Sequence, residues 1–264
     1  MKKRALCVGI NNYPGRKNDL FGCVNDANDW AAELKQRGYE VEKLLDKEAT
    51  RDSMVGALTK LVRGASAGDT LVFTYSGHGS WLPDEDGDEA DGRDEMLCPY
   101  DIDQQQYLMD DDLAEIFNSK PTGAHLFFIS DSCHSGSVSR FAPQPIGGDD
   151  ATQRRARLLP PEEFVKDARQ REIIKRVALA PSTTRQKYPV VLVSGCKDVE
   201  VSYDASFNGR ANGALTRAAL EALKNSPRTP RDWMAEIRKH LPTPNYPQTP
   251  QLYGGRAAKA GPMF

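Results

Sequence analysis

Residues 126–137 read LFFISDSCHSGS, and this stretch decides how the chain is expected to fold. The short apolar run from Leu126 to Ile129 predicts a strand that is buried on both faces. The run stops at small and polar residues that surround Cys133. Ligands of open α/β sheets bind beyond the carboxyl ends of the strands, because loops and helix N-termini meet there. We therefore expect Cys133 at the ligand-binding edge of a sheet.

A second apolar run of the same design precedes His78. Residues 71–75, LVFTY, predict a strand that ends in the small residues of SGHGS at 76–80. If the two strands are parallel neighbours joined by a right-handed crossover, His78 and Cys133 project from the same edge. A cysteine nucleophile with a histidine as its acid/base is the chemistry that this arrangement favours.

The first eighty residues alternate between strand and helix patterns. Strands are predicted over 5–10 and 39–45, and apolar residues recur at helical spacing over 24–37 and from Thr50 to Val62. Together with the strand at 71–75, this order is typical of a parallel sheet that is covered by helices. Further strand patterns lie at 96–100 and 189–194, and further helix patterns at 110–117, 161–177, 213–224 and 229–240.

Composition and charge exclude several classes of protein. The 264 residues are 39% hydrophobic, enough for one buried core, and the net charge of −2 argues against nucleic acid as a partner. Five cysteines without close pairs indicate free thiols in a reducing compartment rather than a disulfide framework. No stretch approaches the roughly 20 apolar residues that a membrane helix needs. We expect a cytoplasmic monomer without a membrane partner.

Four sequence blocks resemble the motifs of metacaspases and their bacterial caspase-like relatives, which are cysteine peptidases. The blocks are GCVNDA at 22–27, YSGHG at 75–79, DSCHSGS at 131–137 and SGCKD at 194–198. The resemblance extends from about residue 4 to about residue 224. It implies an α/β fold, a three-layer α/β/α sandwich with a mostly parallel central sheet, as in caspases.

The resemblance also implies a cysteine endopeptidase in which Cys133 is the nucleophile and His78 the general acid/base. Cys133 would attack a peptide carbonyl, His78 would protonate the departing amine, and water would hydrolyse the acyl-enzyme. The backbone N–H groups of Gly79 and Cys133 would form the oxyanion hole. Two alternatives stay open: a catalytically silent scaffold that binds basic peptides, and a metal-dependent hydrolase. A zinc site of His78, Cys133 and His134 is disfavoured, because adjacent residues rarely reach one tetrahedral centre together.

Carboxylates indicate the substrate. Asp131 lies two residues before Cys133, and in metacaspases the matching aspartate lines the pocket for the residue that precedes the scissile bond. The family positions that match Cys23, Asp26 and Ser76 line this pocket too. Buried carboxylates need a cation, which arginine supplies with forked hydrogen bonds and lysine with a point charge. We therefore expect cleavage after arginine or lysine, although a charge at the start of a helix explains Asp26 equally well.

The domain organisation follows from the resemblance and from a change in composition. We expect one peptidase domain over 1–264, with a large-subunit-like region at 1–140, a basic linker at 141–187 and a small-subunit-like region at 188–264. The linker is rich in proline, glycine and basic residues, and it is expected to be covering material rather than sheet. A peptidase of this specificity could process its own linker. Basic residues there that offer such sites include Arg154, Arg155, Arg157, Lys166, Arg169, Lys175, Arg176, Arg185 and Lys187.

The resemblance implies calcium as a candidate cofactor, because many metacaspases are activated by calcium that binds to a site of four aspartates. Asp94, Asp110 and Asp111 match three of these positions, but the fourth falls on Arg140. A guanidinium cannot coordinate a cation, whereas calcium takes six to eight oxygen ligands in typical sites. Arg140 could instead pair with Asp110 or Asp111 and hold the same loops without a metal. We expect weak calcium binding at best.

Overall fold

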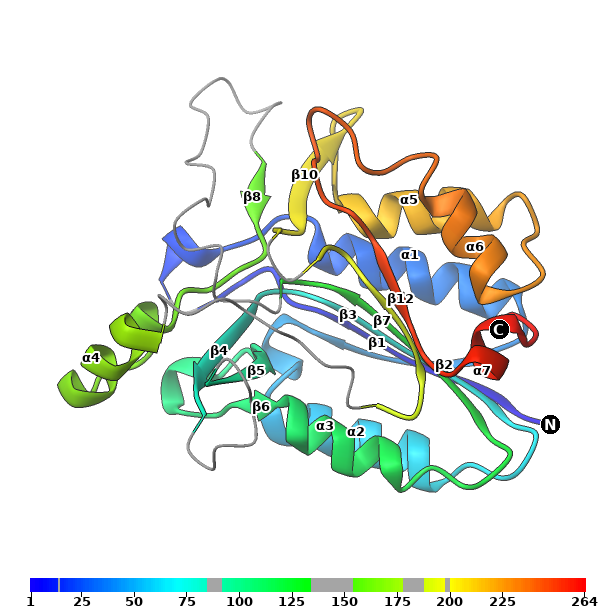
Figure 1. Cartoon of the computed structure of the whole chain (residues 1–264), viewed down its shortest axis with the longest axis horizontal. Coiled ribbons are helices and arrows are strands. Elements are labelled where there is room, and N and C mark those ends of the chain that lie inside the picture. The colour runs from blue at the N-terminus through cyan, green and yellow to red at the C-terminus, as the bar shows by residue number, and fades with distance from the viewer. Residues whose placement is uncertain (14, 85–91, 134–153, 178–187, 198–199) are drawn as a thin grey trace.

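A six-stranded sheet forms the centre of the computed structural model, which describes residues 1–13, 15–84, 92–133, 154–177, 188–197 and 200–264 (Figure 1). Its strand order is β12-β9-β7-β3-β1-β2. The bounds are β1 (Lys3–Gly9), β2 (Glu40–Leu45), β3 (Thr70–Ser76), β7 (His125–Asp131), β9 (Val191–Ser194) and β12 (Gln251–Tyr253). The first five strands pair in parallel, and only the edge strand β12 is antiparallel. The mostly parallel sheet that the sequence predicts is confirmed.

Helices cover both faces of this sheet and complete the predicted three-layer α/β/α sandwich. On one face lie α1 (Cys23–Gln36), α5 (Ala214–Leu223) and α6 (Pro230–Ile237), and on the other lie α2 (Arg51–Arg63) and α3 (Asp110–Asn118) (Figure 1). Successive side chains of a strand point to opposite faces, so each strand serves two cores. In β1, Ala5 and Cys7 pack in the same core as Trp30 of α1, whereas Leu6 and Val8 pack in the core that contains α2.

Two small sheets lie beside the central one. The first contains β4 (Gly79–Pro83), β5 (Arg93–Leu97) and β6 (Leu108–Met109), and the second contains β8 (Arg155–Ala156), β10 (Tyr203–Phe207) and β11 (Arg210–Gly213). The remaining short elements are the 3-10 turns Arg16–Asn18, Asp46–Glu48, Ile102–Gln104 and Pro161–Glu163 and the helices α4 (Ala168–Val177) and α7 (Arg256–Ala260).

The linker departs from its prediction in two ways. Residues Arg155 and Ala156 form strand β8 and pair antiparallel with β10, so part of the linker belongs to a sheet after all. The helix expected over 161–177 is also interrupted, and only Ala168–Val177 is α-helical. The reason is that Phe164 and Val165 turn inward and are buried, while Asp167 starts a new helix by accepting hydrogen bonds from the backbone N–H groups of residues 169 and 170.

Strands β3 and β7 end level with one another. Their register pairs Thr70 with His125 at one end and Ser76 with Asp131 at the other. The strand β7 extends two residues beyond the apolar run that predicts it, because the polar side chains of Ser130 and Asp131 are buried among hydrogen-bonding partners. The loops that follow β3 and β7 therefore begin at the same edge of the sheet. In the described part of the chain, no helix has the length and apolarity to cross a membrane.

Candidate active site

His78 and Cys133 each follow a parallel strand by two residues and lie at the same edge of the sheet. His78 comes after Ser76 at the end of β3, and Cys133 comes after Asp131 at the end of β7. Both are nearly inaccessible, with exposed fractions of 4% for His78 and 0% for Cys133. The prediction that two neighbouring strands deliver these residues to one edge agrees with this placement.

The imidazole of His78 is held by a backbone carbonyl. Its Nε2 lies 2.7 Å from the Asn18 oxygen, which can only accept, so Nε2 carries the proton. Nδ1 is then a free base, and it has no hydrogen-bond partner among the described residues. Burial lowers the pKa of His78 to about 4, opposed by the Asn18 hydrogen bond and assisted by the charge of Arg157. The ring is therefore neutral at pH 7, with Nδ1 unprotonated.

Two backbone N–H groups converge on one carbonyl oxygen beside Cys133. Gly79 N donates to the carbonyl oxygen of Arg157 at 3.0 Å, and Cys133 N donates to the same oxygen at 3.2 Å. A Cβ at position 79 would lie 1.7 Å from the Cys133 carbonyl oxygen, so only glycine allows this approach. These are the two groups that the sequence suggests for an oxyanion hole, and the structure brings them together around a peptide carbonyl.

The backbone of Ser202 fixes both Cys133 and the segment opposite it. Ser202 N donates to Cys133 Sγ at 2.9 Å, and Arg157 N donates to the Ser202 carbonyl oxygen at 2.9 Å. Beyond Arg157, Leu159 N donates to the Gly79 carbonyl oxygen at 3.0 Å, and Ser80 Oγ donates to the Leu159 carbonyl oxygen at 2.6 Å. The segment around Arg157 is thus bound in extended form on both sides of its carbonyl group.

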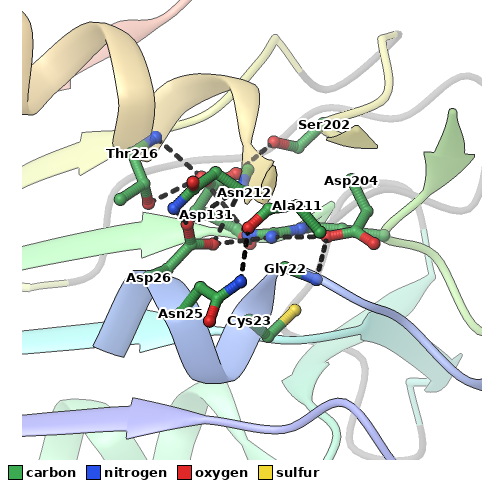
Figure 2. Close-up of polar contacts among 12 residues, drawn as sticks. Gly22, Cys23, Asn25, Asp26, Asp131, Ser202, Asp204, Ala211, Asn212 and Thr216 are labelled. Carbon is green, nitrogen blue, oxygen red and sulfur yellow. Dashed lines mark hydrogen bonds and ion pairs between the residues drawn. The ribbon is translucent and has the colours of Figure 1, made fainter. Parts of the chain in front are cut away.

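The side chain of Arg157 fills a buried pocket of three carboxylates. Figure 2 shows these carboxylates, which belong to Asp26, Asp131 and Asp204. Nη2 lies 2.6 Å from Asp26 Oδ2 and 2.9 Å from Asp204 Oδ1, and Nη1 lies 3.2 Å from Asp131 Oδ2. Nη1 also donates to the Asp131 carbonyl oxygen at 2.9 Å. The guanidinium is fully buried, so charge-assisted hydrogen bonds replace its hydration.

Hydrogen bonds from backbone N–H groups and polar side chains hold each carboxylate in place. Asp26 accepts from Gly213 N and from the Asn212 amide, which ties α1 to β11. Asp131 accepts from Thr216 N and Oγ1 and from Ser202 Oγ. Asp204 accepts from the N–H groups of residues 21 and 22. These hydrogen bonds fix the positions of the three carboxylates around Arg157.

Three carboxylates around one guanidinium leave an excess of negative charge in a dry site. Burial raises the pKa of Asp26 to about 7, against the Arg157 guanidinium, which lowers it. Removing the guanidinium would leave like charges facing one another without solvent, which is costly. The pocket therefore has a strong preference for a buried cation.

The predicted pocket residues Cys23 and Ser76 also lie at this edge. Cys23 is the first residue of α1 and is fully buried, and burial raises the pKa of its thiol well above the usual range. Ser76 is buried at the end of β3 as the register partner of Asp131. Both positions agree with a wall of the pocket.

Sequence reasoning missed Asp204, Ser202 and Asn18. The first two alternate with the apolar residues Val201 and Tyr203, a pattern of period two that predicts a strand with Ser202 and Asp204 on one face. That signal was available, although nothing in it points to this pocket. Asn18 contributes only its backbone oxygen, so its side chain gives no signal.

The predicted calcium ligands lie on adjoining elements of the sheet formed by β4, β5 and β6 and at the start of the helix that follows it. Asp94 lies in β5, and Asp110 and Asp111 begin α3 directly after β6, the strand that pairs with β5. Among the described residues, no group of three or more acidic, histidine or cysteine side chains is arranged to hold a metal ion. Arg140 and the acidic residues 85–91 lie outside the described residues, as does His134 of the disfavoured zinc site.

A family profile of the metacaspase, peptidase C14 domain matches residues 3–141, which contain both His78 and Cys133. The chain belongs to the metacaspase family. As a metacaspase it is a cysteine-type peptidase, and polypeptides are its substrates.

Curated metacaspases match nearly the whole chain. The Metacaspase-1 of Meyerozyma guilliermondii is 32% identical over 283 residues, which cover 95% of this chain and 69% of that protein. The Metacaspase-1 of Coccidioides immitis is 34% identical over 286 residues, which cover 95% of this chain and 61% of that protein. This metacaspase therefore spans about two thirds of the length of these relatives.

Solved structures share the fold of this metacaspase. Protein GSU0716 from Geobacter sulfurreducens superposes with a TM-score of 0.74 at 31% identity, over 98% of this chain and 96% of that one. Caspase-1 from Spodoptera frugiperda superposes with a TM-score of 0.60 at 12% identity, over 96% of this chain and 86% of that one. The second likeness supports the caspase-like sandwich alone, because the two sequences have diverged so far.

Proposed function

We propose that this metacaspase is an endopeptidase that cleaves after arginine or lysine through Cys133 and His78. The observation that carries the proposal is the position of Arg157, whose side chain fills the carboxylate pocket while its carbonyl oxygen accepts from Gly79 N and Cys133 N. A peptide substrate needs the same two contacts, one for its basic side chain and one for the carbonyl that is attacked. The chain's own segment occupies the site as a substrate would.

The proposed reaction proceeds through an acyl-enzyme. Nδ1 of His78 takes the proton of the Cys133 thiol, and Sγ forms a bond to the carbonyl carbon of the substrate. The N–H groups of Gly79 and Cys133 stabilise the negative charge that develops on the carbonyl oxygen. His78 then gives its proton to the departing amine as the peptide bond breaks. Water attacks the thioester and releases the new carboxylate.

The three carboxylates of the pocket account for the proposed specificity. Asp26, Asp131 and Asp204 meet the guanidinium of Arg157 from different sides, which suits a planar group with several fixed donors. Lysine supplies the same charge with fewer fixed contacts and should be the weaker substrate. Aspartate at this position would place a fourth negative charge in a buried site, so cleavage after aspartate should not occur.

Self-processing at the bond between Arg157 and Leu158 is the expected result of this arrangement. Intact-mass analysis of the purified protein should show fragments 1–157 and 158–264, because this is the peptide bond whose carbonyl lies against Gly79 N and Cys133 N. The Cys133→Ala protein should stay intact under the same conditions. The two fragments should elute together, since β9 and β12 from the second fragment belong to the central sheet.

A full-length, uncut protein that hydrolyses basic peptides in solution would contradict this prediction. Until Arg157 leaves, its side chain excludes any other cation from the pocket. Cutting after a different basic residue of the linker, with the Arg157–Leu158 bond intact, would show that the bound segment is not the one that is processed.

Calcium should have little effect on the activity. Peptide hydrolysis by the wild-type protein is expected to change by less than about twofold on chelation, because the fourth acidic position of the family is Arg140 and calcium needs six to eight oxygens. Arg140→Asp restores the missing carboxylate and should make the rate rise with added calcium. Both proteins would be titrated with calcium and then with chelator. Loss of wild-type activity on chelation, recovered by micromolar calcium, would show that Arg140 does not disable the site.

Two further expectations concern the state and place of the protein. All five cysteines are free thiols, which supports a reducing compartment such as the cytoplasm. The described surface exposes few large apolar side chains, Met1, Phe21 and Ile173, and they lie far apart in the sequence. This supports a monomer, because stable interfaces usually need a larger apolar surface.

A further inference from the structure

The segment that occupies the active site has arginine at two more positions, and both guanidinium groups have their own contacts. If Arg157 is the residue before the cut, then Ala156, Arg155 and Arg154 are the second, third and fourth residues before it. Strand β8 holds this segment against β10, with Ala156 opposite Tyr203 and Arg155 opposite Asp204. Because side chains alternate along a strand, Arg155 points to the same side as Arg157, toward the start of α1.

Arg155 lies on an exposed aromatic ring. Its guanidinium carbon is 4.5 Å from the centre of the Phe21 ring, and Nη1 donates to the Asp19 carbonyl oxygen at 2.6 Å. Phe21 keeps an exposed fraction of 47%, unusual for so large an apolar side chain. Its backbone N–H donates to Asp204 Oδ2 at 2.7 Å, so the ring is anchored to the wall of the carboxylate pocket.

Arg154, on the other side of the strand, also contacts an aromatic ring and a backbone oxygen. Its guanidinium carbon lies 5.4 Å from the centre of the Tyr203 ring, and Nη1 donates to the Asn245 carbonyl oxygen. Tyr203 packs near Tyr246, at 6.2 Å between ring centres. The contacts of both arginines thus consist of a ring face and a backbone oxygen, which fit a flat cation.

We propose that Phe21 and the Asp19 carbonyl form a subsite that selects arginine at the third residue before the cut, so that the preferred substrates are polybasic segments of the form Arg-x-Arg. This inference rests on the proposed cleavage after arginine and deepens it. A planar guanidinium stacks on the ring while it donates to the carbonyl, whereas an ammonium or an amide makes only part of that contact. The site would therefore bind two arginine side chains of the substrate, at the first and third residues before the cut.

The test compares fluorogenic peptides that differ only at the third residue before the cut. The wild-type protein, after self-processing and with both fragments present, is assayed with Gln-Arg-Ala-Arg, Gln-Lys-Ala-Arg and Gln-Gln-Ala-Arg amides, and Phe21→Leu is prepared and assayed in the same way. Leucine keeps an apolar side chain and the backbone N–H that binds Asp204, but it has no ring face. In the wild type, kcat/KM for arginine over glutamine should be about 3- to 10-fold, with lysine between them. In Phe21→Leu this ratio should fall to near one. In the separate variant Phe21→Tyr, which keeps an aromatic ring, the ratio should stay close to the wild-type value.

The outcomes separate this inference from the function on which it rests. Hydrolysis of all three peptides at equal rates by the wild type would overturn the subsite and leave cleavage after arginine standing. An arginine preference that survives in Phe21→Leu would also overturn it, because the ring would not be its source. If the wild type hydrolyses none of the three peptides, the proposed cleavage after arginine fails and the subsite fails with it.

Discussion

Cys133→Ala should lower peptide hydrolysis by at least about 10³-fold, since the acyl-enzyme cannot form without the sulfur. His78→Ala is expected to cause a loss of similar size, because the imidazole that we propose as the acceptor of the thiol proton is then missing. The two losses should not add in the double variant, as both residues serve one step. Initial rates with a peptide amide ending in arginine measure each effect.

The fold should survive both substitutions. His78 and Cys133 lie on the loops after β3 and β7 rather than within the sheet. Cys133 is buried in the core that contains α1, but its change to alanine removes only the sulfur atom. Thermal unfolding curves serve as the control, and each variant should melt within a few degrees of the wild type. Unchanged turnover by Cys133→Ala would refute the mechanism. The alternative of a silent scaffold predicts that wild type and Cys133→Ala bind a basic peptide equally and that neither hydrolyses it.

Asp26→Asn should reduce kcat/KM for an arginine peptide by about 10²- to 10³-fold. The substitution keeps the size of the side chain but removes one charge that faces a buried guanidinium, and breaking a buried ion pair costs about 3–5 kcal/mol. The amide of the new asparagine would also turn a donor toward Arg157 Nη2, where a carboxylate oxygen now lies at 2.6 Å. The substrate's arginine would meet the same conflict.

A ratio of two substrates separates this effect from a loss of folded protein. Peptides with arginine or glutamine before the cut are compared in the same sample, so the amount of active enzyme cancels. The ratio should fall in Asp26→Asn and stay at the wild-type value in Asp52→Asn, whose side chain is 91% exposed on α2. An unchanged ratio in Asp26→Asn would mean that this carboxylate only fixes the start of α1, the role that the sequence favours equally.

The parts of the site that follow strands could be predicted from the sequence. Two apolar runs end abruptly at Cys133 and His78, and a parallel sheet brings such ends to one edge, so the pair was placed correctly without any contact information. The place of Asp131 in the pocket could be predicted because it lies two residues before Cys133. Asp26 depended on the resemblance, because a carboxylate in the first turn of a helix has an ordinary explanation.

The occupant of the pocket could not be predicted, because its contacts are made across long stretches of chain. Arg157 meets Asp26 across 131 residues and Asp204 across 47 residues. The linker composition favours irregular structure, and the two-residue strand β8 forms only because β10 offers its edge. Among the ten basic residues of the linker, that pairing places the carbonyl group of Arg157 between Gly79 and Cys133.

Covalent labelling tests the central claim most directly. The protein would be treated with the chloromethyl ketone of Arg-Arg-Ala-Arg, and the modified residue found by peptide mapping in the mass spectrometer. The pocket and the nucleophile together predict one adduct, on the sulfur of Cys133, and none with the matched reagent that ends in aspartate. An adduct on another residue such as Cys196, or equal labelling by the aspartate reagent, would contradict the account.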